Sequence, residues 1–313
     1  MSVIPPVVAV VGPTAAGKSG LAVDLALRLG GEVVNGDSMQ IYRGMDIGTA
    51  KLSPGERRGV PHHLLDILDV GEPSTVAEFQ GWARESIGDC RARGVTPVLV
   101  GGSALYLRAV LDEFDFPGTD PVVRARLERE LTARGGEAMH AVLRERDPAA
   151  ADVILPSNGR RVVRALEVIE ITGGPYRATL PAPSYAFDQV VQIGLEVPRA
   201  VLDERIERRV ESMWAAGLVS EVRRLERAGL RDGRTASRAL GYHQVLRFLA
   251  GECTEEQARA DTVTRTRQFA RRQDSWFRRD DRIARLDYDD HELCAAAVQV
   301  VSRSRAASPA RSR

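Results

Sequence analysis

Two stretches near the N-terminus carry residues suited to phosphate chemistry and proton transfer. The first reads G-P-T-A-A-G-K-S and fits the pattern G-x-x-x-x-G-K-[ST]. An apolar β-branched run, Val7–Val11, precedes it, and a segment with helical periodicity follows. Such a strand–loop–helix directs backbone N–H groups and the positive end of a helix at one point, which suits a diphosphate or triphosphate. We therefore predict a phosphate-binding loop made of Gly12, Pro13, Thr14, Ala15, Ala16, Gly17, Lys18 and Ser19.

Lys18 and Ser19 have the side chains that matter most in this loop. The ammonium of Lys18 would neutralise outer phosphate oxygens, and the Ser19 hydroxyl would coordinate Mg²⁺. Lys18 and Lys51 are the only lysines in a chain that otherwise uses arginine, and a compact point charge suits phosphate. The alternative is a turn of small residues that matches the pattern by chance, which the flanking strand and helix disfavour.

The second stretch, Asp37–Lys51, reads D-S-M-Q-I-Y-R-G-M-D-I-G-T-A-K. Asp37 follows the second predicted strand, Glu32–Val34, and so lies close to the loop, where it could act as a base; the alternative role is a helix N-cap. A motor ATPase or a nucleotide-dependent switch protein would carry an Asp after a third apolar strand, to orient Mg²⁺ and water. Here that run, Val98–Val100, ends in G-G-S, with Ser103 last, which argues against those classes.

The composition of the chain excludes several classes of protein. The chain has 313 residues, 43% hydrophobic, and a net charge of +1, so it can bury a sizeable core and shows no bulk charge signal. Cys90, Cys253 and Cys294 are widely spaced, which argues against disulfides or a zinc site, and His62 and His63 are interpreted as structural. The sequence shows no signal peptide and no apolar run of membrane-spanning length, so we expect no membrane association and a cytoplasmic location.

Strand and helix signals alternate in the first part of the chain, as in a doubly wound parallel sheet. Helical patterns at Thr75–Arg93 and Ala104–Leu111 flank the predicted strand Thr96–Val100, and Val190–Val197 reads as a further strand. We predict an α/β fold with a P-loop NTPase-like parallel sheet, formed by residues 1–116 and 188–301 together with a helical C-terminal region. Its helices are predicted at Arg199–Ala216, Leu218–Ala228, Ser237–Ala250 and Thr254–Arg278.

Residues 117–187 are predicted to form a helical insertion domain, because the segment shows helical patterns and no strand between two Pro- and Gly-rich stretches. The last residues, 302–313, contain Ser, Ala, Arg and Pro without an apolar face and are predicted to be disordered. Helices of the insertion are expected at Val122–Arg134, Glu137–Asp147, Ala149–Leu155 and Arg160–Thr172.

The motifs together resemble the bacterial tRNA dimethylallyltransferases over about residues 7–285. The resemblance implies transfer of a dimethylallyl group from its diphosphate to the exocyclic N6 amine of the adenosine 3′ of the anticodon, in tRNAs that read codons beginning with U. Besides the two stretches above, its motifs are P-H-H-L-L-D-I (Pro61–Ile67), V-G-G-S-A-L-Y-L (Val100–Leu107), R-A-L-E-V (Arg164–Val168), L-G-Y (Leu240–Tyr242) and T-R-Q-F-A-R-R-Q-D-S-W-F (Thr266–Phe277).

The resemblance also implies catalytic residues. Asp37 matches the family's base, which would raise the low nucleophilicity of the adenine amine. Arg209 matches an arginine that binds the diphosphate with Lys18 and Mg²⁺, although it could also be a surface arginine of its helix. Ser103 stands where the family usually has threonine; it keeps the hydroxyl but lacks the methyl that stiffens the side chain, or it simply closes a glycine turn. Motif matching would label the loop as ATP- or nucleotide-binding, whereas the resemblance implies that it holds the prenyl diphosphate and consumes no ATP.

The implied partners are dimethylallyl diphosphate and the anticodon stem-loop of tRNA, bound by a monomer. The target base must leave its stack, and arginines can bind phosphates or stack on exposed bases. Eight arginines fall between Arg265 and Arg285, although Arg enrichment can also reflect genome composition. The matched tRNA-binding positions are Asp37, Ser38, Met39, Gln40, Ser103, Arg124, Arg160, Arg161, Arg164, Arg238, Gly241, Tyr242, His243, Arg271, Arg272 and Gln273.

Three other functions stay open on sequence grounds. An adenylate isopentenyltransferase would share the loop and the prenyl chemistry but use a free nucleotide, and the helical insertion argues against it. A small-molecule kinase would need little more than the glycine-rich loop. A nucleic-acid-binding module with a vestigial loop would not need Asp37 and Ser103 beside that loop.

Overall fold

Six parallel strands form the central sheet of the structure, a computed structural model that describes residues 4–113, 116–176 and 182–307. The strand order is β3-β2-β4-β1-β5-β6, and each neighbouring pair is parallel. This confirms the predicted α/β fold with a doubly wound parallel sheet. The strands are β1 (Val7–Val11), β2 (Gly31–Asn35), β3 (His62–His63), β4 (Thr96–Gly101), β5 (Val190–Glu196) and β6 (Ile283–Asp287).

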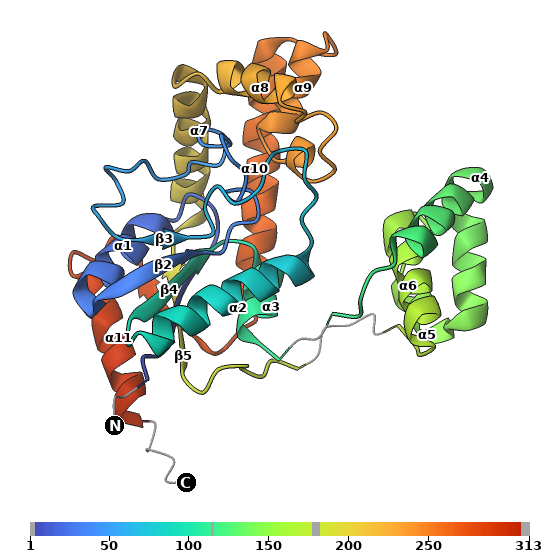
Figure 1. Cartoon of the computed structure of the whole chain (residues 1–313). Coiled ribbons are helices and arrows are strands. Elements are labelled where there is room, and N and C mark those ends of the chain that lie inside the picture. Colours follow the sequence, from blue (N-terminus) through green and yellow to red (C-terminus); the bar gives the residue numbers. More distant parts are fainter. Residues whose placement is uncertain (1–3, 114–115, 177–181, 308–313) are drawn as a thin grey trace. The chain divides into compact units, whose positions relative to one another are not determined.

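Helices cover both faces of the sheet because side chains of β1 alternate between two apolar clusters. Val8 and Val10 belong to the cluster that includes α1 and α11, whereas Val7 and Ala9 belong to the cluster that includes α2 and α3. Figure 1 shows these helices around the sheet. Their bounds are α1 (Lys18–Leu29), α2 (Val76–Ala92), α3 (Ala104–Leu111) and α11 (Leu293–Ala307).

A group of C-terminal helices extends beyond the carboxyl ends of the strands, with α7 and α10 packed side by side (Figure 1). One predicted helix, Ser237–Ala250, is divided in the structure because Gly241 has a φ of 85°, which no helix accommodates. The helices are α7 (Arg199–Ala215), α8 (Leu218–Arg227), the 3₁₀-helix η1 (Ala236–Arg238), α9 (Tyr242–Leu249) and α10 (Glu255–Phe277).

The prediction of disorder from residue 302 onward is wrong for residues 302–307, which continue helix α11. Ala297 and Val301 of this helix are buried in the same cluster as α1. Alanine and arginine, which dominate the following residues, are good helix formers, so the helix continues past its last buried side chain. The remainder of the predicted tail, residues 308–313, lies outside the described residues.

Residues Glu113–Ser184 form a second compact unit, separate from the unit of Met1–Asp112 and Tyr185–Arg313. Its own apolar core contains Met139 and Leu166, both almost fully buried. Two helices, Val122–Arg134 and Glu137–Asp147, are predicted where the structure has the single kinked helix α4. The kink lies at Gly135, whose φ is 80°, and so falls at the predicted division. The helices of this unit are α4 (Pro121–Arg146), α5 (Pro148–Val153) and α6 (Gly159–Thr172).

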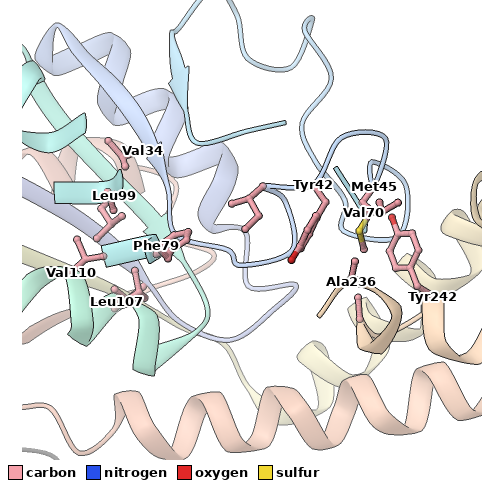
Figure 2. Close-up of a cluster of buried hydrophobic side chains, with 14 of the residues drawn as sticks. Val34, Tyr42, Met45, Val70, Phe79, Leu99, Leu107, Val110, Ala236 and Tyr242 are labelled. Atoms are coloured by element: carbon pink, nitrogen blue, oxygen red, sulfur yellow. The ribbon is translucent and has the colours of Figure 1, made fainter. Parts of the chain in front are cut away.

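The segment that follows β2 is anchored by the same apolar cluster that covers one face of the sheet. Tyr42 and Met45 are fully buried, and Figure 2 shows them packed near Val70 and Tyr242. Burial of two large side chains fixes the path of a segment that has no helix or long strand of its own. This anchoring holds the residues after Asp37 at the carboxyl end of β2.

Candidate active site

The phosphate-binding loop connects β1 to α1. Gly12, Ala15 and Gly17 have φ angles of 139°, 64° and 100°, so positive φ angles recur along the loop between residues whose φ is negative. Such alternation points successive N–H groups to one side and forms an anion-binding concavity. Helix α1 begins directly after Gly17, so its positive end adds to the same site.

Lys18 is buried at the first position of α1, and its ammonium Nζ donates a hydrogen bond to the Pro13 carbonyl at 2.6 Å. Burial, followed by the nearby guanidinium of Arg209, lowers the pKa of Lys18 to about 7, although Asp37 opposes the shift. A diphosphate bound in the loop would supply the negative charge that favours protonated Lys18. The side chain is therefore poised to gain its charge together with an anion.

Asp37 caps a turn, and the alternative of a helix N-cap is wrong, because residues 38–41 form a turn. Its Oδ1 accepts a hydrogen bond from the Met39 N–H at 2.8 Å, and its own N–H donates to Asn35 Oδ1 at 2.9 Å. These bonds fix the carboxylate, while Oδ2 accepts no hydrogen bond from the part of the chain that is described. A fixed carboxylate with one free oxygen can accept a proton from a bound group.

Ser103 occupies the N-cap position of α3, two residues after β4 ends at Gly101. Its hydroxyl makes no capping hydrogen bond. Serine at this position normally bonds the first free N–H groups of the helix. The half-buried hydroxyl is therefore available to a ligand.

Arg209 of α7 reaches the segment after Asp37, where its Nη2 donates to the Thr49 carbonyl at 3.2 Å. Burial lowers its pKa, and the Asp37 carboxylate acts in the opposite direction. The alternative of a surface arginine without a role in the site is disfavoured, because Arg209 lines the cavity described next.

A cavity of about 590 Å³ brings Asp37, Ser103 and Arg209 together with Thr14 of the phosphate-binding loop. One part of its wall is apolar, which suits a hydrocarbon group, and another part carries arginines, which suit phosphates or bases. The apolar lining includes Met39, Ile206, Val210, Met213, Leu240 and Phe269, and the arginines besides Arg209 are Arg234, Arg238 and Arg272.

The residues matched to tRNA binding divide into those that reach this cavity and those that do not. Ser38, Met39, Arg238 and Arg272 line it. Gln40 does not line it; its Nε2 donates to the Thr49 carbonyl at 3.1 Å, the same oxygen that Arg209 contacts.

Four further matched positions in the C-terminal helices lie outside the cavity lining. His243 and Arg271 are exposed, and Arg271 lines a separate surface groove with Arg199. Gly241 is buried, and Tyr242 is fully buried, so its side chain is not accessible to RNA in this structure.

Gln273, by contrast, lines the cavity, but it is only 6% exposed and is bonded to two loops.

The matched arginines of the second unit have two different environments. Arg124 and Arg164 both form ion pairs with the fully buried carboxylate of Glu167. Arg164 also donates to the Pro117 carbonyl at 2.6 Å, so it fixes the start of the unit. Arg160 is exposed and Arg161 is half-buried at the first turn of α6.

Glu221, which sequence reasoning missed, holds the segment that carries Thr49. Its buried carboxylate accepts hydrogen bonds from the N–H groups of Ile47 and Gly48 at 2.9 and 3.2 Å, and from the Tyr242 hydroxyl at 2.6 Å. A Cβ at Gly48 would lie 2.4 Å from the Tyr242 ring, so only glycine fits there. The available signal was an acidic residue on the apolar face of an otherwise amphipathic helix.

Lys51, the other lysine, stabilises this segment from inside. Its Nζ donates to the Tyr42 carbonyl at 2.9 Å and to Asp46 and Asp66 at 2.8 and 2.6 Å. The role of Lys51 is therefore structural.

Glu32, His63 and Cys90 form a group of potential metal ligands whose atoms lie within 4.8 Å of one another. The sequence did not indicate this group, because its members are about 30 residues apart along the chain. Arg93, however, donates two hydrogen bonds to the Glu32 carboxylate at 2.8 and 2.7 Å, and burial raises the pKa of Cys90 to about 12. The Glu32 carboxylate is thus already bonded to His63 at 2.7 Å and to Arg93, and His63 remains interpreted as structural.

Comparison with known proteins identifies relatives over nearly the whole chain. Residues 40–280 match the family model described as IPP transferase. The tRNA dimethylallyltransferase of Thermobifida fusca is 64% identical over 94% of this chain and 94% of its own length. The protein of the same name from Streptomyces coelicolor is 63% identical over 97% of this chain and 99% of its own length.

Solved structures agree with the sequence relatives. The full-length tRNA isopentenylpyrophosphate transferase of Bacillus halodurans is 40% identical, with a TM-score of 0.70 over 96% of this chain and 98% of that chain. A eukaryotic dimethylallyltransferase acting on tRNA is 26% identical, with a TM-score of 0.82 over 99% of this chain and 81% of that chain.

Proposed function

Because this chain belongs to the IPP transferase family, we propose that it is a tRNA dimethylallyltransferase. It transfers a dimethylallyl group from dimethylallyl diphosphate to the N6 amine of the adenosine 3′ of the anticodon, in tRNAs that read codons beginning with U, and releases diphosphate. One observation of the structure carries the proposal: a single cavity joins a phosphate-binding loop to Asp37, Ser103 and Arg209 and has an apolar wall.

Asp37 is the proposed base. The lone pair of the adenine N6 amine is delocalised into the ring, so the amine is a poor nucleophile. Removal of its proton by the Asp37 carboxylate, as the bond from N6 to the allylic carbon forms, raises its nucleophilicity. Oδ2 is the oxygen free to accept this proton, since Oδ1 is bonded to the Met39 N–H.

The positive groups of the site stabilise the leaving diphosphate. As the bond from the allylic carbon to oxygen breaks, negative charge grows on the diphosphate, and fixed cations nearby stabilise that charge most. Lys18 and Arg209 are proposed for this role, with the unbonded Ser103 hydroxyl as a further donor.

Ser19 is proposed to bind Mg²⁺ with the donor. The chemistry of the residues fits, because Ser19 follows Lys18 in α1 and its half-buried hydroxyl has no hydrogen-bond partner among the described residues. Mg²⁺ keeps several waters and binds through few protein ligands and phosphate oxygens, so one hydroxyl is adequate. The ion would supply positive charge to the diphosphate.

The acceptor is proposed to be a stem-loop of tRNA, as the name of the tRNA-acting eukaryotic relative suggests. Arg238 and Arg272 at the cavity, Arg271 beside Arg272 on α10, and Arg160 in the second unit are exposed and can bind phosphates or bases. We propose that the protein acts on tRNA as a monomer. No described helix has the length and hydropathy needed to cross a bilayer, and we propose that the enzyme meets tRNA in the cytoplasm.

The direct test incubates the protein with dimethylallyl diphosphate, Mg²⁺ and unmodified tRNA, followed by mass analysis of the nucleosides. The expected product is an adenosine heavier by one dimethylallyl group, located 3′ of the anticodon, with no ATP consumed. An unmodified nucleoside pool, or hydrolysis of ATP independent of tRNA, would contradict the proposal, and ATP hydrolysis would favour the kinase alternative.

A further inference from the structure

The side chain of Gln273 connects two loops of the active site that are distant in sequence. Its Oε1 accepts a hydrogen bond from the Thr14 N–H in the phosphate-binding loop at 2.9 Å. Its Nε2 donates to the Gly102 carbonyl, directly before Ser103, at 2.8 Å. The side chain is 6% exposed; its bond to Gly102 is buried, and its bond to Thr14 is partly buried.

The contact with Gly102 is close enough to restrict the residue there. A Cβ at position 102 would lie 2.5 Å from Gln273 Nε2 and 3.2 Å from the Gly12 carbonyl oxygen. The glycine therefore lets the β4–α3 turn approach both the amide and the phosphate-binding loop. A primary amide has one acceptor and one donor side at a fixed distance, so it sets the separation of the two loops.

We propose that Gln273 is a positioning residue for the prenyl donor and not a contact to the RNA. The proposal rests on the proposed function, since it concerns the geometry of the diphosphate site. The amide holds the phosphate-binding loop and the backbone before Ser103 at the spacing that a bound diphosphate requires. Without it, the Thr14 N–H and the Gly102 carbonyl lose their partner, and the two loops can separate.

The neighbours of Gln273 on α10 provide a contrast within one helix. Arg271 and Arg272 are exposed and available to phosphates, whereas Gln273 points into the protein and is bonded to the donor site. One rigid helix thus carries both the cations that face solvent and the amide that orders the loops. Changes at adjacent positions should therefore affect different substrates.

The test compares Gln273→Leu with Arg271→Ala, an exposed position on the same helix. Calorimetry without RNA gives the Kd for inorganic diphosphate and for dimethylallyl diphosphate, each with Mg²⁺. Fluorescence anisotropy gives the Kd for an anticodon stem-loop. Gln273→Leu should raise both diphosphate Kd values by about tenfold or more, since one buried and one partly buried hydrogen bond are lost, and leave the RNA Kd within about twofold. Arg271→Ala should weaken RNA binding only.

Gln273→Asn provides a second variant if the leucine variant does not fold. It keeps an amide but is one methylene too short to reach both loops, so it should raise the diphosphate Kd by a smaller factor than leucine does, in a protein that still unfolds cooperatively above the assay temperature. The proposal is overturned if the Gln273 variants bind diphosphate normally, or if they weaken RNA binding as Arg271→Ala does. A wild-type protein that binds no dimethylallyl diphosphate and modifies no tRNA would instead contradict the proposed function.

Discussion

Three charged side chains, Lys18, Asp37 and Arg209, influence one another electrostatically in the active site. Two cations and one anion give a local excess of positive charge that a diphosphate would neutralise, while the Asp37 carboxylate stays available for a proton. Burial lowers the pKa of both cations, and the Asp37 carboxylate offsets this effect only in part.

Replacement of Asp37 by asparagine tests its role as the base. The amide keeps the size of the side chain and can still bond the adenine amine, but it cannot accept the proton. Asp37→Asn should bind tRNA and prenyl diphosphate nearly normally and turn over roughly 10²–10⁴-fold more slowly, as single-turnover rates would show. Asp69→Asn, at a side chain that is 72% exposed, is the control and should keep the wild-type rate. Near-normal turnover of Asp37→Asn would mean that the base lies elsewhere.

The pKa of Lys18 predicts that diphosphate binding depends on pH. In the free protein this pKa is lowered to about 7, so above pH 7 the neutral amine dominates, and an anion must bind together with a proton. The affinity for diphosphate should therefore fall by up to about tenfold per pH unit between pH 7 and 9. Calorimetry at pH 8 in buffers of different ionisation enthalpy should show proton uptake.

Lys18→Met is the matched variant, because it keeps the buried aliphatic stem and removes the charge. It should bind diphosphate weakly with little change between pH 7 and 9. The unfolded chain binds more protons at position 18 than the folded protein between the lowered pKa of about 7 and the ordinary value of 10.5, so this group's contribution to stability rises with pH there. Lys18→Met should lack that rise. If the wild-type affinity for diphosphate does not change with pH and no proton is taken up, Lys18 does not become protonated when diphosphate binds.

Sequence reasoning predicted the phosphate-binding loop and the positions of Asp37 and Ser103, because these follow strands whose carboxyl ends must meet at one edge of a parallel sheet. It could not predict the partners of Gln273, which bonds Thr14 and Gly102, 259 and 171 residues away in sequence. It also missed Glu221: an acidic residue on the apolar face of a helix indicates a buried partner, but the partner, the backbone N–H groups of residues 47 and 48, lies on a segment distant in sequence.

In the second unit, one buried carboxylate, that of Glu167, holds the helices together. Burial alone would raise the pKa of Glu167, but hydrogen bonds from Arg124, Thr119 and Arg164 lower it below its usual value. These bonds connect α6 to the N-terminal part of α4 and the residues before it. Arg124 and Arg164 therefore have a structural role in this unit that does not require RNA.

A comparison of Arg124→Ala with Arg160→Ala separates the structural arginines of this unit from those available to RNA. Arg124→Ala removes a partner of a fully buried charge and should lower the free energy of unfolding of the unit by about 1–3 kcal/mol. Arg160→Ala, at an exposed position, should leave stability unchanged, weaken stem-loop binding and reduce its salt dependence by about one phosphate contact. Thermal melts and salt-dependent anisotropy measure the two effects, and equal stability of both variants would contradict this division.

Helix boundaries also show where periodicity fails as a guide. The breaks at Gly135 and Gly241 come from positive φ angles that single glycines permit, and only one of them was anticipated as a division between helices. Strand β6 and helix α11 were not predicted, because β6 lies at the sheet edge with a mixed polar pattern and α11 buries only a narrow stripe on α1. Packing against a neighbour, rather than local pattern, defines both elements.

For the whole molecule, a net charge of +1 means that attraction to RNA depends on where arginines lie and not on their number. The cavity is large enough to hold more than a five-carbon group with its diphosphate, and its arginine-lined wall remains for an acceptor. The family relatives share nearly the full length of this chain, including the second unit, which a free nucleotide would not require.

The choice of acceptor is the most direct test of this account. An unmodified anticodon stem-loop and AMP are supplied separately with labelled dimethylallyl diphosphate and Mg²⁺, and kcat/KM is measured for each. Because contacts remote from the reacting amine lower the barrier only for the stem-loop, its kcat/KM should exceed that of AMP by at least about 100-fold. Equal or faster prenylation of AMP would contradict the account and identify the protein as an isopentenyltransferase of free nucleotides.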